Sequence, residues 1–157
     1  MAYVSLDSDQ IKKAHKKHKY TKEQVEQLEQ CMDPKSGPLF FMKQFMKIQH
    51  PVKGSMPFHP FPYQERLINS YNDHRFSIAM LPRQTGKTTC ASGYLIWYAM
   101  FRPDSQILIA AHKYAGASDI MSRVRYAYEM LPSWIKAGVT QYNRNSIEFD
   151  NGSKIMA

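Results

Sequence analysis

The chain has 157 residues, of which 43% are hydrophobic and 22% charged, and this composition indicates a globular domain with a core and excludes a disordered segment. No apolar run approaches the ~20 residues that a membrane span needs, so we predict no membrane partner. The formal net charge of +8 is spread over both halves of the chain, which is compatible with work near nucleic acid but marks no single basic domain.

The first 48 residues predict a helical N-terminal extension. A basic run over 12–19 is typical of a solvated arm, with a DNA or RNA contact as the alternative. Thr21 and Gln24 have the spacing of a capping box, which predicts that a helix begins there. A second, apolar helix is expected over 39–48.

Residues 49–62 contain four prolines and a glycine, so we expect an extended connector without regular structure. Tyr63 and Gln64 follow it directly and open a helix that runs to Tyr71. A glutamine amide can hydrogen-bond to the edge of adenine, and an aromatic ring can stack on the base. A purely structural role for this pair is the alternative.

Residues 81–89, Leu-Pro-Arg-Gln-Thr-Gly-Lys-Thr-Thr, are the most informative stretch. An apolar run over 76–81 predicts a strand before them, and the apolar run over 90–101 predicts a helix after them. The order strand, tight loop and helix is what gives a Gly-Lys-Thr sequence the meaning of a phosphate-binding loop. The third domain that we predict, over 63–157, is built around this loop.

The chemistry expected of the loop follows from its residue types. Backbone N–H groups of Arg83, Gln84, Thr85 and Gly86 and the positive end of the helix surround phosphate oxygens. The Lys87 ammonium is expected to reach the β- and γ-phosphates, and the Thr88 hydroxyl to hold Mg²⁺, with Thr89 completing the site. The predicted cofactors are therefore ATP and Mg²⁺.

One position departs from the usual spacing, because the first glycine of Gly-x4-Gly-Lys-Ser/Thr is replaced by Leu81. Arg83 then lies inside the loop. It is either a solvated loop arginine or a cation held near the γ-phosphate that stabilises charge during phosphoryl transfer.

The remaining elements predict an α/β fold. A buried parallel strand is expected over 105–111, which completes a β–α–β unit, and a helix over 118–130. Asn151-Gly152 predicts the turn of a hairpin over 146–156. We do not interpret 147–150 as the acidic strand of an ATPase, because the run is short and Asp150 belongs to the turn.

Taken together, these segments resemble the N-terminal part of the large terminase subunit of tailed bacteriophages, in particular the myovirus type. The resemblance covers roughly residues 37–157 and is specific in combination. The segments that carry it are 63–64, 81–89, 109–113, 130–132 and 146–153.

The resemblance implies a P-loop NTPase of the RecA/ASCE-like type, with a partial parallel sheet flanked by helices. It implies an ATPase motor that pumps double-stranded DNA into a procapsid, and a nuclease elsewhere in the family's large subunit. By matched position, Lys87 and Arg83 are the catalytic residues, Thr88 binds Mg²⁺, and Tyr63 and Gln64 meet the adenine. The implied partners are the portal protein, the small terminase subunit and other copies of the large subunit in a ring, in the host cytoplasm and transiently at the portal.

We expect the sequence to end at Ala157 before the acidic Walker B strand and the carboxylate that activates water. Residues 1–157 alone are therefore predicted to bind ATP weakly and not to hydrolyse it. One alternative is that the missing C-terminal part of the family protein is a separate chain and a partner of this one. Two other functions remain open: a superfamily 2 helicase, and a non-catalytic module that binds nucleotide to hold its shape.

Overall fold

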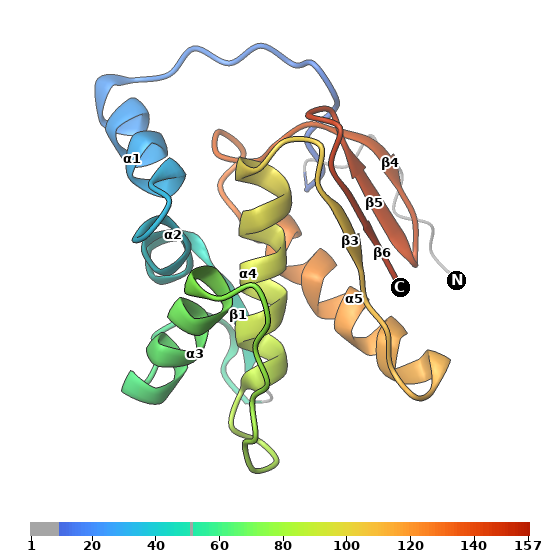
Figure 1. Cartoon of the computed structure of the whole chain (residues 1–157). Coiled ribbons are helices and arrows are strands. Elements are labelled where there is room, and N and C mark those ends of the chain that lie inside the picture. Colours follow the sequence, from blue (N-terminus) through green and yellow to red (C-terminus); the bar gives the residue numbers. More distant parts are fainter. Residues whose placement is uncertain (1–9, 51) are drawn as a thin grey trace.

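The computed structural model describes residues 10–50 and 52–157, so residues 1–9 of the predicted extension and Pro51 of the connector lie outside it. This part of the chain forms a mixed α/β structure with two sheets (Figure 1). The helices are α1 (Lys22–Met32), α2 (Gly37–Phe45), α3 (Pro62–Asp73), α4 (Lys87–Phe101) and α5 (Tyr114–Glu129). The strands are β1 (Lys47–His50), β2 (Gly54–Pro57), β3 (Gln106–Leu108), β4 (Val139–Tyr142), β5 (Ser146–Phe149) and β6 (Lys154–Met156).

The helix α1 begins at the predicted capping box. The Gln24 backbone N–H donates to Thr21 Oγ1 at 3.3 Å, and the Thr21 N–H donates to Gln24 Oε1 at 3.1 Å. These two bonds satisfy donors that a helix N-terminus leaves free, so the prediction of this start is confirmed.

The N-terminal helices pack on α4, which is the central helix of the core. Trp97 of α4 is completely buried, and its indole N–H donates to the carbonyl oxygen of Cys31 at the end of α1, at 2.8 Å. Phe41 of α2 packs edge-on against Phe101, with ring centroids 5.7 Å apart. A buried indole needs a partner for its N–H, and this bond therefore fixes how α1 sits on α4.

The predicted connector contains an element that the sequence analysis excluded. The strands β1 and β2 pair as a two-stranded antiparallel hairpin, in which Lys47 pairs with Pro57 and His50 pairs with Gly54. The expectation of an irregular connector over 49–62 is wrong at this point. A proline disrupts a sheet only where a neighbouring strand needs its missing backbone N–H. Pro57 is tolerated because it belongs to the end pair of a two-stranded sheet, in which both strands are edge strands.

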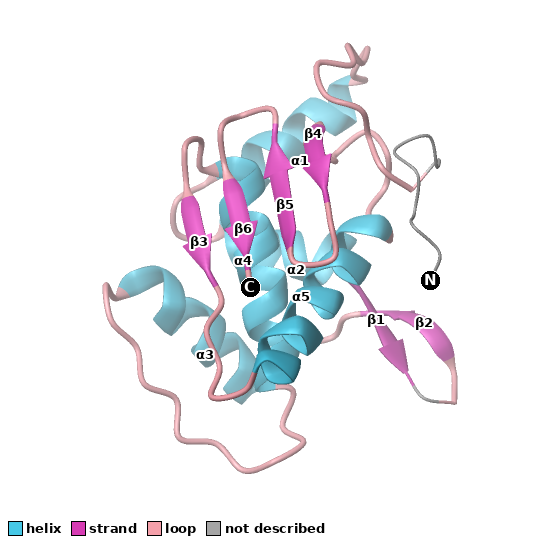
Figure 2. Ribbon diagram, turned by 90° about the vertical axis from the view of Figure 1, so that its right-hand side faces the viewer, coloured by secondary structure: helices cyan, strands magenta, loops and turns pink. Residues whose placement is uncertain are grey.

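The second sheet has the strand order β3-β6-β5-β4, and Figure 2 shows the helices on one face of it. The hairpin β5–β6 turns at Asn151-Gly152 as predicted, with Gly152 at φ 83°. Only β3 and β6 are parallel; β4, β5 and β6 run antiparallel. The expected parallel sheet is therefore a mixed sheet among the described residues, because the hairpin supplies two of its four strands.

The apolar run before the loop does not form the predicted strand. Within the described chain, no strand lies beside residues 76–81, and the side chains of Phe76, Ile78 and Met80 are 82%, 95% and 92% exposed. This run forms the long open loop between α3 and α4 in Figure 1. A buried parallel strand needs neighbours that pair its backbone N–H and C=O groups, and without them the run stays hydrated.

The other helices begin and end near the predicted residues, and α2 ends at Phe45 instead of Ile48 because β1 begins at Lys47. The arm before α1 is not wholly solvated. Ile11 is buried, and the Val139 N–H of β4 donates to the Lys12 carbonyl oxygen at 2.9 Å, so residues 10–15 lie along the edge of β4. None of the described helices is both long and apolar enough to cross a membrane.

Candidate functional site

The loop before α4 turns tightly into the helix. Gln84 has φ 64°, and Gly86, the residue that caps α4, has φ 75°. The Thr85 hydroxyl donates to the Pro82 carbonyl oxygen at 3.0 Å, which closes the loop on itself. A Cβ added at Gly86 would meet Gln64 Nε2 at 2.5 Å, so this position requires glycine for its backbone angle and for its close approach to α3.

The Lys87 ammonium lies over the curve of the loop. It donates to the carbonyl oxygen of Pro82 at 3.0 Å and to that of Leu81 at 3.5 Å. Lys87 is also the first residue of α4, where the free N–H groups and the helix dipole favour an anion. The lysine therefore curls over the loop, although the strand expected before it is absent among the described residues.

Two predicted residues lie in the loop region without partners. Within the described part of the chain, Arg83 is exposed and makes no hydrogen bond or ion pair, and the Thr88 hydroxyl, in the first turn of α4, accepts and donates none. Arg83 therefore does not fold into the loop. Thr89 points elsewhere, because it lines a separate cleft described below.

The structure brings Tyr63 and Gln64 to the loop, and their predicted contact with adenine stays a prediction. The Tyr63 hydroxyl and Gln64 Nε2 both donate to the Thr85 carbonyl oxygen, at 3.0 Å each. Gln64 is 6% exposed, and its Oε1 accepts from the Phe61 N–H at 2.9 Å. The Nε2 end of the Gln64 amide thus holds the loop against α3, and the Oε1 end caps the N-terminus of α3.

Phe61 is a site residue that was not predicted. Its ring stacks on Tyr63, with centroids 5.8 Å apart and planes 6° from parallel, and it is 62% exposed. The order aromatic-Pro-Tyr-Gln was visible in the sequence, but nothing in it indicated that the two rings would stack at the edge of the loop.

Acidic groups are absent from this site in the described chain. Lys87 makes no ion pair, and no group of three or more His, Cys, Asp or Glu side chains there could hold a metal ion. The two cysteines are buried and free, and burial raises the pKa of Cys31 to about 12 and that of Cys90 to about 11. Both thiols therefore stay protonated and unreactive near neutral pH.

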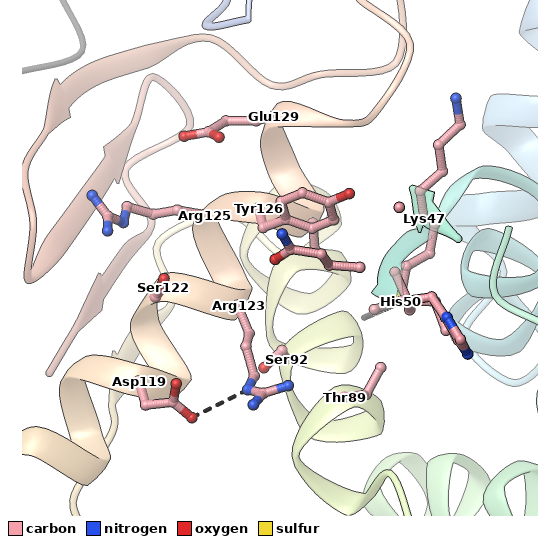
Figure 3. A pocket seen from close by; sticks show the side chains of 15 residues that line it. Lys47, His50, Thr89, Ser92, Asp119, Ser122, Arg123, Arg125, Tyr126 and Glu129 are labelled. Carbon is pink, nitrogen blue, oxygen red and sulfur yellow. Dashed lines mark hydrogen bonds and ion pairs between the residues drawn. The ribbon is translucent and has the colours of Figure 1, made fainter. Parts of the chain in front are cut away.

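A second polar site, which we call the hairpin cleft, lies beside the first turns of α4. It has a volume of about 800 Å³ and is bounded by the β1–β2 hairpin, α4 and α5 (Figure 3). Sequence reasoning missed it, because its residues come from three separate segments and share no motif. The side chains that matter below are those of Lys47, His50, Thr89, Ser92, Asp119 and Arg123.

A comparison with known protein families identifies the family of the C-terminal half of the chain. Residues 78–157 match the family described as terminase large subunit, T4likevirus-type, N-terminal. The matched segment begins within the apolar run before the loop and includes α4, β3, α5 and the whole mixed sheet. It is just over half of the chain, and the chain therefore belongs to this N-terminal family of T4likevirus-type large terminase subunits.

Proposed function

We propose that this chain is the ATP-binding part of a large terminase subunit, the motor that packages double-stranded DNA into procapsids. Its family membership gives it a role in phage DNA packaging. The observation that carries the nucleotide-binding part is the tight loop at the start of α4, with the Lys87 ammonium held over it by the carbonyl oxygens of Leu81 and Pro82.

The residues of the loop fit a triphosphate by their chemistry. The two carbonyl oxygens that now accept from Lys87 are weaker partners for an ammonium than phosphate oxygens are, so the lysine can exchange one for the other. The α4 N-terminus offers unpaired backbone N–H groups to an anion. Bound ATP and Mg²⁺ would supply the phosphoanhydride bond and the metal that bridges its phosphates, and Thr88 would be the protein ligand to that metal.

Arg83 and the aromatic pair have proposed roles at the edge of the loop. Arg83 is free to turn toward a γ-phosphate, since it has no partner to leave within the described chain. The exposed Phe61–Tyr63 stack offers a face for the adenine ring. Gln64 would meet the adenine edge only by giving up a bond to Thr85 or to Phe61, and we therefore assign it first to holding the loop.

We propose the P-loop NTPase fold on the same grounds, and the partners follow from the family: the portal, the small subunit and other large subunits in a ring. The exposed run over 76–81 departs from that fold, in which it would be a strand of the sheet. Hydrolysis also needs a carboxylate to orient water, and no carboxylate contacts the loop within the described residues. We therefore expect binding without turnover from these 157 residues.

Lys87→Ala tests the proposal. Calorimetric titration of the 157-residue chain with Mg·ATP should show an affinity at least about tenfold lower in the variant, because a charged hydrogen bond contributes about 1.5–3 kcal/mol. Lys22→Ala, which removes an exposed lysine of α1, is the matched control and should bind like the unchanged chain.

Equal affinity in the Lys87→Ala and Lys22→Ala chains would contradict the phosphate-binding role of the loop. Multiple turnovers of ATP by the purified chain would contradict the expectation of binding without hydrolysis. A non-catalytic assembly module is the second candidate, favoured by the lack of a carboxylate at the loop, and it predicts that turnover stays absent when every packaging partner is present.

A further inference from the structure

The hairpin cleft is a built polar site rather than a gap between elements. The hydroxyl of Ser92 lies in it, and Ser92 is 1% exposed. Its Oγ has no hydrogen-bond partner, although buried polar groups in folded proteins almost always have one. Figure 3 shows Ser92 on α4, beside the Arg123 guanidinium that reaches across from α5. A buried hydroxyl without a partner beside a cleft can donate to a ligand that a small rearrangement of its neighbours admits.

The other side chains that line the cleft include several donors, and Lys47 and His50 lie on its hairpin side, across from Ser92 and Arg123 (Figure 3). Lys47 of β1 is exposed and has no partner among the described residues. His50 Nδ1 accepts from the N–H groups of Val52 and Lys53, at 3.2 and 3.1 Å, so its other ring nitrogen carries a proton and can donate. Thr89 lines the same cleft from the first turn of α4.

The two carboxylates of the cleft do not cancel this character. Asp119 is paired with Arg123 at 3.2 Å, which holds the guanidinium in place and leaves most of its N–H groups free. Glu129 accepts from the Tyr142 hydroxyl at 2.6 Å, and in Figure 3 it points away from the hairpin, as Arg125 also does. Apart from Glu129 and Arg125, the polar side chains named here as lining the cleft are two cations, Lys47 and Arg123, three neutral donors and one partnered carboxylate.

We propose that the hairpin cleft binds phosphate groups of the backbone of double-stranded DNA. Lys47 and Arg123 supply the charge, and Ser92, Thr89 and His50 supply neutral hydrogen bonds to phosphate oxygens, which are the contacts that position a protein on DNA without reading its sequence. The inference rests on the proposed function, because the family packages DNA, and it names where this chain meets that DNA. A free nucleotide carries the same phosphate chemistry, and the experiment below separates the two.

The position of the cleft connects the proposed DNA contact to the nucleotide-binding loop through one helix, α4. Thr89 and Ser92 lie in the first two turns of α4, and Lys87 begins the same helix. DNA held in the cleft and a phosphate held by the loop would therefore bind to one rigid element. A shift of α4 that follows nucleotide binding would move the DNA contact with it.

The test measures how the affinity of the 157-residue chain for a short labelled duplex depends on salt, by fluorescence anisotropy. Lys47→Ala/Arg123→Ala removes the two cations of the cleft, and Lys16→Ala/Lys17→Ala removes two cations of the exposed arm as a charge-matched control. We expect the slope of log K against log salt to become less steep by about two in the cleft variant. The arm variant should keep the slope of the unchanged chain.

Two further variants distinguish a contact from a structural effect. Ser92→Ala removes a buried hydroxyl that has no partner, so it should leave the chain as stable or more stable in urea while its DNA affinity falls severalfold. Asp119→Asn removes the carboxylate and should strengthen DNA binding. An unchanged slope in the cleft variant, or a slope that falls in the arm variant instead, overturns the proposal.

The source of the phosphate is tested in the Lys87→Ala chain, which lacks the lysine of the loop. Mg·ATP added at constant ionic strength should not displace the duplex from this chain, and displacement would assign the cleft to free nucleotide and overturn the DNA contact. The unchanged chain could fail to bind ATP while the slope of log K against log salt is still less steep in the cleft variant. In that case the nucleotide-binding proposal fails and the proposed DNA contact at the cleft is kept.

Discussion

At the scale of the residue, the Thr85 carbonyl oxygen joins two segments of the site. It accepts from both Tyr63 and Gln64, and Gln64 is buried and also accepts from the Phe61 N–H. We predict that Gln64→Leu lowers the free energy of unfolding by about 1–3 kcal/mol, because it leaves the partly buried Phe61 N–H without a partner and removes one donor to Thr85. Tyr63→Phe should cost no more than about 1 kcal/mol, because Gln64 still donates to that oxygen.

Urea titration of the two variants, followed by circular dichroism, measures both values. The two donors share one acceptor, so their effects should not add in the double variant. A Gln64→Leu chain as stable as the unchanged one would show that the loop does not depend on this contact.

At the scale of the element, the turn into α4 requires Gly86 for two reasons, and a second glycine separates them. Gly86 and Gly54 have φ 75° and 69°, but a Cβ at Gly54 would meet nothing within 4 Å, whereas one at Gly86 would meet Gln64 Nε2 at 2.5 Å. We predict that Gly54→Ala costs about 1–2 kcal/mol from the backbone angle alone. Gly86→Ala should cost at least about 1 kcal/mol more, because the Gln64 amide must leave Thr85.

Thermal unfolding of the two variants at the same pH compares these costs directly. Equal losses would mean that the α3 contact does not stabilise the loop. The comparison is well matched because neither glycine lies in the interior of a helix, so helix propensity does not enter.

At the scale of the whole molecule, Lys136 ties the arm before α1 to the C-terminal half of the chain. Its ammonium is buried and donates to the carbonyl oxygens of Gln10, at 2.6 Å, and Glu129, at 2.8 Å. Burial lowers the pKa of Lys136 from 10.5 to about 8, and the charge of Glu129 opposes that shift only in part. Lys12 donates to the Lys136 carbonyl oxygen, and the Tyr128 ring lies under the ammonium.

The pH dependence follows from this lowered pKa. Between about pH 8 and 10.5 the unfolded chain keeps a proton on Lys136 that the folded chain has lost, so the free energy of unfolding should rise with pH. The contribution is at most about 1.4 kcal/mol per pH unit. The raised pKa values of Cys31 and Cys90 act in the opposite direction above pH 9, since the unfolded thiols then lose protons first.

Urea titrations at pH 8 and 9 of the unchanged chain and of Lys136→Met isolate this effect. The unchanged chain should gain more stability over this step than the variant, whose apolar side chain does not titrate. The same pH slope in both chains would contradict the burial of a lowered-pKa amine.

Local interactions made much of the fold predictable from the sequence. The capping box of α1, the Asn151-Gly152 hairpin and the helices α3, α4 and α5 depend on residues within a few positions of one another, and all of them form near the predicted residues. The order of Tyr63 and Gln64 upstream of the loop predicted a contact with adenine, and the structure places both residues against the loop. The match to the terminase family over 78–157 is consistent with the motifs that the sequence displays.

Only the tertiary structure decided the features that need partners distant in the chain. The apolar run over 76–81 is not a strand here, because a strand is made by its neighbours and none of the described strands pairs with it. The β1–β2 hairpin forms despite its prolines, because a sheet with two free edges does not need every backbone donor. The hairpin cleft could not be predicted at all, because it exists only where β1, α4 and α5 meet, and burial there is what leaves the Ser92 hydroxyl without a partner.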